Sequence, residues 1–320
     1  MIKRGAFVIF SILISASFLV GCTKPPEPFV TVRAGYQIKN VILFIADGAG
    51  SNHYASCDVT YPTATYSGWV KTQSLTPANV WPTDSAAAAT AMAYGEKVLN
   101  EQVGIVGKQN ITEHFHAAGK QTAIMTTDDM WGATPAGFSA CAANRNDYAD
   151  IRTSQMATPH YVDYFMGGFN AVDYGDYYGD ARFHSKLGTA QNPMDGLLLT
   201  MVNNFLGNVA NTTTGFFLMA ENEDTDTNSH AQNLPGMKAA MIDFNNAVHA
   251  ALSWAQNRRD TLIIVTSDHE CGGLTLQNGE YAYTLGDHTA VNVPIWLWGA
   301  RLSKSIIDNT EIFKLLKTFA

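Results

Sequence analysis

Short apolar runs alternate along this chain with longer segments in which apolar positions recur at helical spacing. The runs at 41–46, 216–220, 262–266 and 293–298 are rich in β-branched and aromatic residues. Runs of this length are typical of strands buried on both faces of a parallel sheet. Alternation of such strands with helices predicts an α/β fold, in which helices cover both faces of a mainly parallel central sheet.

The pattern also gives approximate bounds for the elements. We predict strands near residues 40–47, 65–74, 121–127, 214–220, 261–267 and 293–299, the second of them resembling an edge strand. Helices are predicted after Gly50, from Ser85, and near 112–118, 135–144, 192–206, 236–257 and 308–318. No internal repeat interrupts this alternation.

The stretch from 147 to 191 follows neither period. It carries many tyrosines and phenylalanines among glycines and aspartates. Long irregular segments of compact domains are usually functional covers or disordered, and the aromatic content argues against disorder. Two interpretations stay open: a rim of a substrate site, or a packed surface insertion without contact to a ligand.

The first residues have the features of an export signal. Lys3 and Arg4 precede the apolar stretch 6–20, which is too short for a confident membrane span. Residues 19–21 resemble the bacterial lipobox before Cys22. We therefore expect removal of residues 1–21, lipidation of Cys22, a proline-rich tether over 22–38, and one folded domain over 39–320. The alternatives are an ordinary signal peptide that contains a cysteine, or an uncleaved anchor.

Charge and cysteine content bear on two questions: whether the chain binds nucleic acid and whether it contains disulfide bonds. The formal net charge is -8, and an acidic chain argues against nucleic-acid binding. If Cys22 is lipidated, the other cysteines are Cys57, Cys141 and Cys271. Three cysteines can form at most one disulfide bridge, so we expect no disulfide framework. Cys271 lies two residues after His269; we interpret it as a small buried residue, with zinc ligation as the alternative.

Side chains that bind metals follow the ends of several predicted strands. Ligands of open α/β sheets bind at the carboxyl ends of the strands, so these side chains should meet at one edge. Imidazole and carboxylate donors in this mixture fit zinc better than calcium. The pattern therefore predicts a multinuclear metal site, and its candidate ligands are Asp47, Glu221, Asp226, His230, Asp268, His269 and His288.

Five motifs, in chain order, resemble those of the alkaline phosphatase family. They are residues 40–50, 83–87 around Ser85, the Glu221, Asp226 and His230 spacing, 266–269, and 286–289. The resemblance extends from about residue 39 to about 299. It implies the three-layer sandwich of that family and a phosphomonoesterase that hydrolyses small phosphate monoesters. Family members are often homodimers; nothing in the periodicity of this chain indicates that assembly.

The resemblance also implies two zinc ions and a serine nucleophile. Ser85 would form a phosphoserine intermediate, and its position in the first turn of a helix favours phosphate binding. One zinc ion would be bound by Asp226, His230 and His288, and the second by Asp47, Ser85, Asp268 and His269. Asp226 and His230 would share a face if their segment is helical.

A magnesium ion and an arginine complete the implied site. Glu221, Thr134 and a second oxygen of Asp47 match the magnesium site of the family, and magnesium prefers oxygen donors. Arg145, at the end of the predicted helix 135–144, matches the arginine that binds two phosphate oxygens.

Two positions depart from the family pattern. Gly132 lies two residues before Thr134, where the family usually has Asp or His, and Asp128 or Asp129 would have to compensate. Thr227 follows Asp226 at the substrate site, where the family often has Lys or His. We therefore expect fewer positive charges around the phosphate.

Three other functions can be weighed on the same residues. A sulfatase requires x-Pro-x-Arg after its nucleophile, and four alanines follow Ser85. Phosphodiesterases and nucleotide pyrophosphatases of the same superfamily generally lack the equivalents of Glu221 and Arg145, and stay as the alternative. A non-catalytic lipoprotein that binds zinc or phosphate would use the same ligands but would give Ser85 no role.

Overall fold

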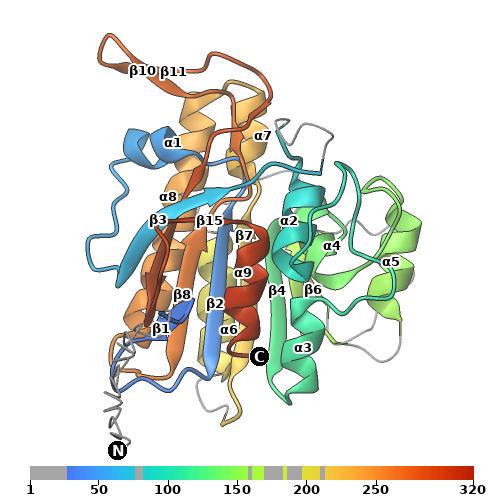
Figure 1. Cartoon of the computed structure of the whole chain (residues 1–320). Helices are drawn as coiled ribbons and strands as arrows, with labels where there is room; N and C mark the ends of the chain where they lie inside the picture. Colours follow the sequence, from blue (N-terminus) through green and yellow to red (C-terminus); the bar gives the residue numbers. More distant parts are fainter. Residues whose placement is uncertain (1–26, 76–81, 158–160, 169–182, 186–196, 210–212) are drawn as a thin grey trace, which may run out of the picture.

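The structure is a computed structural model that describes residues 27–75, 82–157, 161–168, 183–185, 197–209 and 213–320 (Figure 1). The export signal, Cys22, the first part of the tether and much of the 147–191 stretch lie outside the described residues. Cleavage and lipidation therefore stay predictions. Within the described ranges, no helix is both long and apolar enough to cross a membrane.

A nine-stranded sheet forms the centre of the described fold. β13 is antiparallel to both of its neighbours, and the other adjacent strands are parallel. The predicted α/β class with a mainly parallel sheet is confirmed. In spatial order the strands are β15 (Ile306–Asp308), β3 (Tyr66–Lys71), β13 (Val293–Trp298), β8 (Thr261–Thr266), β2 (Asn40–Ala46), β7 (Phe216–Asn222), β4 (Gln121–Asp129), β5 (Tyr164–Gly168) and β6 (Phe183–Ser185).

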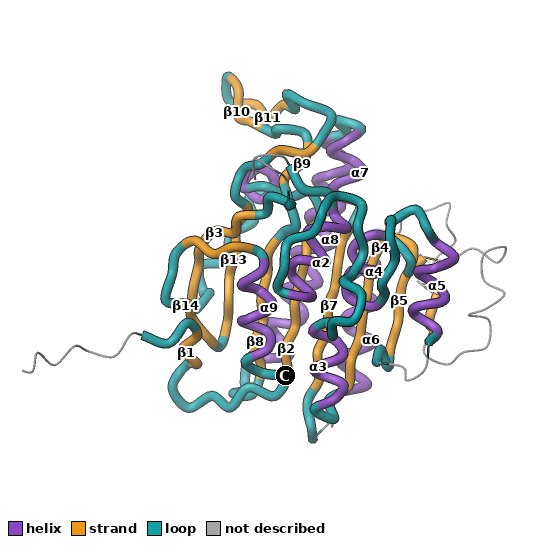
Figure 2. The backbone as a smooth tube through the Cα atoms, turned by 45° about the vertical axis from the view of Figure 1, so that its right-hand side comes forward, coloured by secondary structure: helices purple, strands orange, loops and turns teal. Residues whose placement is uncertain are grey.

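Helices cover both faces of this sheet (Figures 1 and 2). Successive side chains of a strand point to opposite faces, so Leu43 and Ile45 of β2 join one core cluster while Ile42 and Phe44 join the other. The first cluster is covered by α2 (Ser85–Tyr94), α3 (Ile111–Ala117), α4 (Ala133–Ser139) and α9 (Thr310–Lys317). The second is covered by α6 (Leu197–Val209) and α8 (Leu234–Ala255).

Three expectations about local structure are wrong. The strand predicted at an edge, β3, lies between β13 and β15, because a three-residue strand pairs with its outer side. The helix predicted near 135–144 ends at Ser139. The 147–191 stretch, predicted to lack regular structure, contains α5 (Tyr148–Met156), the strand β5 and the edge strand β6.

The carboxyl ends of β2, β7, β8 and β4 meet at the upper edge of the sheet in Figure 1. Around this edge lie α1 (Ser51–Ser56), α7 (Asp224–His230) and the antiparallel pair β9 (Glu270–Cys271) and β12 (His288–Thr289). A hairpin of β10 (Thr275–Gln277) and β11 (Glu280–Ala282) projects beyond it. β1 (Val30–Val32) pairs with β14 (Ala300–Leu302) elsewhere in the fold.

Candidate metal centre

Short connections after the strands bring the candidate ligands to the carboxyl edge. Gly48 follows Asp47 with a φ of 69°, and a Cβ built there would lie 2.5 Å from Asp226 Oδ1 and 2.9 Å from Asp226 Cα. Glycine is therefore needed for the close approach of α7 as well as for the turn. The Gly48 N–H also donates to Asp268 Oδ1 at 3.1 Å, so one turn positions ligands from three strand ends.

The first group of candidate ligands surrounds Nε2 of His269. This atom lies 3.2 Å from Ser85 Oγ, 3.3 Å from Asp47 Oδ1 and 3.2 Å from Asp268 Oδ2. A single ring nitrogen can share one proton with only one of the three oxygens. Both carboxylate oxygens are buried and have no other hydrogen-bond partner within the described residues.

Electrostatics at this group favour a cation. Burial lowers the pKa of His269 well below its ordinary value, so the ring is neutral and can offer a lone pair. Burial, followed by repulsion from Asp268, raises the pKa of Asp47 well above its ordinary value. Buried carboxylates that repel one another around a neutral imidazole form a group that could hold a metal ion.

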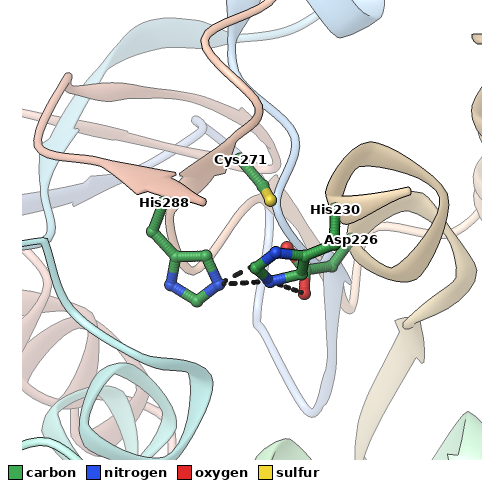
Figure 3. Close-up of side chains that lie close together, drawn as sticks. All are labelled: Asp226, His230, Cys271 and His288. Carbon is green, nitrogen blue, oxygen red and sulfur yellow. Dashed lines mark hydrogen bonds and ion pairs between the residues drawn. The ribbon is translucent and has the colours of Figure 1, made fainter. Parts of the chain in front are cut away.

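The second group is formed by Asp226, His230 and His288 (Figure 3). Nδ1 of His230 lies 2.9 Å from the Gly286 carbonyl, and Nδ1 of His288 lies 2.7 Å from the Thr83 carbonyl. Because a carbonyl only accepts, each Nδ1 carries a proton, and each ring can present a lone pair on Nε2 when that second nitrogen is deprotonated. Backbone partners of this kind orient metal-binding histidines.

The two Nε2 atoms of this second group face each other at 3.0 Å. Asp226 adds Oδ2 at 3.3 Å from His230 Nε2 and Oδ1 at 3.7 Å from His288 Nε2. The hydrogen bond with Asp226 raises the pKa of His230 to about 9, which shows how strongly this arrangement favours a bound positive charge. The segment of Asp226 and His230 is helical, as α7, so the condition under which these two residues would share a face is met.

The two groups adjoin each other, because the rings of His269 and His288 stack with centroids 3.6 Å apart. Cys271 also lies at the second group: β9 and β12 pair Cys271 opposite His288, and ligand atoms of Cys271, Asp226, His230 and His288 all lie within 4.8 Å of one another. Cys271 is buried, as predicted. Its Sγ is a potential fourth ligand, the role that the sequence left as the alternative.

Ser85 is held at the start of α2, beside a cationic side chain. Asp84 caps this helix through Oδ1, which accepts from the Ala87 N–H at 2.9 Å, and its Oδ2 accepts from Arg145 Nη1 at 3.2 Å. Burial disfavours the charge of Arg145, but Asp84 more than offsets it, so the pKa of Arg145 is raised. An anion at Ser85 would meet the N-terminus of α2 and a guanidinium group.

The sequence suggested that Arg145 lies at the end of a helix, but in the structure it lies outside the helices. It belongs to the loop between α4 and α5, and its backbone N–H donates to the Glu101 carbonyl at 2.7 Å. Sequence reasoning missed Asp84 as the residue that fixes Arg145. The two are 61 positions apart, and only the folded chain brings them together.

The residues predicted for magnesium form an oxygen-rich group next to Asp47. Glu221, at the end of β7, is buried and accepts a hydrogen bond from the Thr126 hydroxyl. Burial and then the charge of Asp128 raise the pKa of Glu221 well above its ordinary value. The Thr134 hydroxyl is near enough to affect this pKa, yet it is buried and makes no hydrogen bond of normal geometry in the described part of the chain.

Thr227 lies on α7 with its side chain exposed, and its hydroxyl donates to Glu223. Burial, followed by the charge of Asp128, raises the pKa of Glu223 to about 7. Sequence reasoning missed Glu223 as a further carboxylate of this region. Its spacing of two residues from Glu221, at a strand end, was the available signal.

Comparisons with known proteins point to one family. A family model described as alkaline phosphatase matches residues 38–173 and 160–292. Alkaline phosphatase 3 of Bacillus subtilis is 28% identical over 88% of this chain and 71% of its own length. Alkaline phosphatase 4 of the same organism is 29% identical over 76% of this chain, which spans 64% of that relative.

Solved structures agree on the fold. A variant of the alkaline phosphatase of the Antarctic bacterium TAB5, described with Mg bound in the M3 site, superposes with a TM-score of 0.76 and 25% identity, over 89% of this chain and 98% of the other. The alkaline phosphatase of Thermus thermophilus gives a TM-score of 0.75 at 16% identity, over 89% and 92% of the two chains. The predicted three-layer architecture is confirmed.

Proposed function

The chain belongs to the alkaline phosphatase family, and from this premise we propose that it hydrolyses phosphate monoesters through a phosphoserine formed on Ser85. One observation carries the proposal. The Ser85 hydroxyl lies at the same ring nitrogen of His269 as two buried carboxylate oxygens, at the start of a helix and beside Arg145. A non-catalytic scavenger of zinc or phosphate would give this hydroxyl no role as a nucleophile.

The donor sets support two zinc ions and one magnesium ion. Asp226, His230 and His288 would hold one zinc ion, and Asp47, Ser85, Asp268 and His269 the other. Oxygen donors of Glu221, Thr134 and Asp47 suit magnesium. When bound, such ions lower the pKa of a hydroxyl in contact with them and neutralise charge on the attacking and leaving oxygens.

The residues of the chain would carry the following steps. Arg145 and the N-terminal amides of α2 orient the phosphoryl group so that Ser85 Oγ faces phosphorus. Ser85 Oγ forms a bond to phosphorus while the ester P–O bond breaks. The Ser85 hydroxyl loses its proton in this step, and the leaving oxygen gains a proton to depart as the alcohol. Water then cleaves the phosphoserine, which releases inorganic phosphate and restores the Ser85 hydroxyl.

Arg145 favours a monoester over a diester as the substrate. A monoester dianion offers three non-bridging oxygens and a diester only two, so a diester competes less well for the arginine and the helix amides. Loss of one hydrogen bond to a charged group costs about 1.5–3 kcal/mol, which is about 10- to 150-fold in rate.

The test compares two chromogenic substrates on the metal-loaded protein. We expect kcat/KM for p-nitrophenyl phosphate to exceed that for bis(p-nitrophenyl) phosphate by at least about tenfold. Arg145→Ala should lower the monoester rate more than the diester rate, whereas Arg301→Ala, at an exposed position of β14, should change neither. A preference for the diester in the unchanged protein would support the phosphodiesterase alternative instead.

Cys271 provides a second test of the same proposal. A catalytic zinc ion keeps a position open for substrate, whereas four protein ligands make a closed structural site. The proposal therefore requires that Cys271 Sγ is not a permanent ligand. We expect Cys271→Ser to keep the bound zinc and to stay within about threefold of the original activity, because three ligands and an open position remain.

Cys57→Ser is the matched control, since this half-buried thiol is absent from the metal-ligand groups of the described chain. Metal analysis and the absorption spectrum of the cobalt-substituted protein are the measurements. A thiolate-to-cobalt charge-transfer band that disappears in Cys271→Ser, together with loss of metal, would contradict an open site.

A further inference from the structure

Gly132 precedes α4 with a backbone conformation that any residue can adopt, with φ of −55°. The space that a side chain would take is nevertheless occupied. A Cβ built on Gly132 would lie 1.8 Å from Asp128 Oδ2 and 2.6 Å from Asp128 Cγ. The end of the Asp128 side chain therefore fills the space beside Gly132, and a larger residue at this position would require the carboxylate to move.

Hydrogen bonds fix Asp128 next to the oxygen-rich group. Its N–H donates to Thr126 Oγ1 at 2.9 Å, and its Oδ1 accepts from the Asp129 N–H at 2.6 Å. The Thr126 hydroxyl in turn donates to Glu221 Oε2. One threonine thus connects the end of β4, which carries Asp128, to the end of β7, which carries Glu221.

Asp128 lies near two further carboxylates. Its charge acts on both Glu221 and Glu223, and it acts on the guanidinium of Arg145 less strongly than the charges of Asp84 and Asp47 do. A group of carboxylates is a favourable environment for a bound cation.

An independent observation points to the same place. Thr134 is the second residue of α4, two residues after Gly132, and its hydroxyl is almost fully buried. It lies close enough to Glu221 to affect the pKa of that carboxyl, but it makes no hydrogen bond of normal geometry to a described residue. A buried hydroxyl without a partner is costly unless a ligand satisfies it. Carboxylates and a hydroxyl are hard oxygen donors, which suit magnesium and the water molecules it retains.

We propose that Asp128 supplies, from the end of β4, the carboxylate that position 132 lacks, and that it helps to hold Mg²⁺ with Glu221 and Thr134. The Asp128 carboxylate occupies the space that a side chain at position 132 would need. The inference rests on the proposed function for the presence of a magnesium ion. Binding can be measured without any substrate.

The test is calorimetric titration of zinc-loaded protein with Mg²⁺. Asp128→Asn should weaken magnesium binding by about tenfold or more, as loss of a carboxylate around a metal commonly does. Zinc content should stay the same. Asp129→Asn is the matched control, because it removes the charge of a half-buried carboxylate one residue away, and it should stay within about twofold.

A transfer of the carboxylate tests the shared space. Asp128→Ala/Gly132→Asp should bind magnesium within about threefold of the original protein, while Asp128→Ala alone should not, because the two positions are coupled. Gly132→Asp alone should lower the unfolding temperature, since two carboxylates would overlap. This variant serves as the check that the space is filled.

Unchanged magnesium affinity in Asp128→Asn, or an equal loss in Asp129→Asn, would overturn the proposal. A transfer variant that folds but binds as weakly as Asp128→Ala would overturn it as well. If the original protein binds zinc but no magnesium, the role of Asp128 is refuted, while hydrolysis of p-nitrophenyl phosphate by the same sample would leave the proposed function standing.

Discussion

Replacing Ser85 with alanine is expected to lower turnover of p-nitrophenyl phosphate by at least about 10³-fold, because loss of a nucleophile removes the covalent route and leaves only the binding contributions. The fold should persist. Ser85 is the first residue of α2, Asp84 still caps that helix through the Ala87 N–H, and alanine is the most favourable residue for a helix.

Acid trapping with labelled substrate measures the intermediate directly. The original protein should retain phosphate on a peptide that contains Ser85, and Ser85→Ala should retain none. Ser139→Ala is the matched control, since Ser139 is also a buried serine but lies at the end of α4, hydrogen-bonded to Gln155. Label on the Ser85→Ala protein, or on another residue of the original protein, would refute the assignment.

The strands of the sheet centre were predictable because burial on both faces leaves a simple signal. β2, β7 and β8 consist of continuous apolar runs, and each was predicted to within two residues. The candidate ligands follow directly at the ends of these runs, so the position of the site was predictable from the order of the elements alone. The helix α2 was equally predictable, because its run of alanines favours a helix and allows close packing.

Short elements at the sheet edges were not predictable. β6 and β15 have three residues each, and β5 contains two glycines. Such segments become strands only because a neighbouring strand offers backbone hydrogen bonds, which no local pattern records. The same reason explains why β3 was taken for an edge.

Contacts between distant side chains were the other limit. The pairing of β9 with β12 decides that Cys271 faces His288, and the fold decides that Asp84 holds Arg145. Asp128 was more accessible to sequence reasoning, since it lies only four residues from Gly132. The choice between Asp128 and Asp129 still required the folded chain, in which the Asp128 carboxylate lies against Gly132.

Removing the metals is expected to lower activity by more than about 100-fold, since the ions stabilise charge on both reacting oxygens. It should also destabilise the protein, because a ligand that binds only the folded state stabilises it. Without ions, the carboxylates of Asp47, Asp268 and Glu221 stay buried with hydrogen bonds that only partly compensate them.

The loss of stability should depend on pH in a defined direction. The pKa of His230 rises from 6.5 to about 9 in the metal-free fold, and that of Glu223 from 4.5 to about 7. Between pH 6.5 and 9 the folded metal-free protein therefore binds more protons than the unfolded chain, so its stability falls as pH rises. His53, with its pKa lowered to about 4, contributes the opposite slope only below 6.5.

Thermal unfolding of the chelated and the zinc- and magnesium-loaded protein, at about pH 7 and about pH 9, tests this expectation. The chelated protein should unfold at a lower temperature at the higher pH, and the stabilisation by metal should increase, because metal replaces the protons that the ligands lose. His230→Ala should reduce this pH dependence, whereas His249→Ala on α8 should not. Full activity after exhaustive chelation, in protein that contains no bound ion, would refute a metal-dependent site. A chelated protein whose unfolding temperature rises toward pH 9 would contradict the raised pKa of His230.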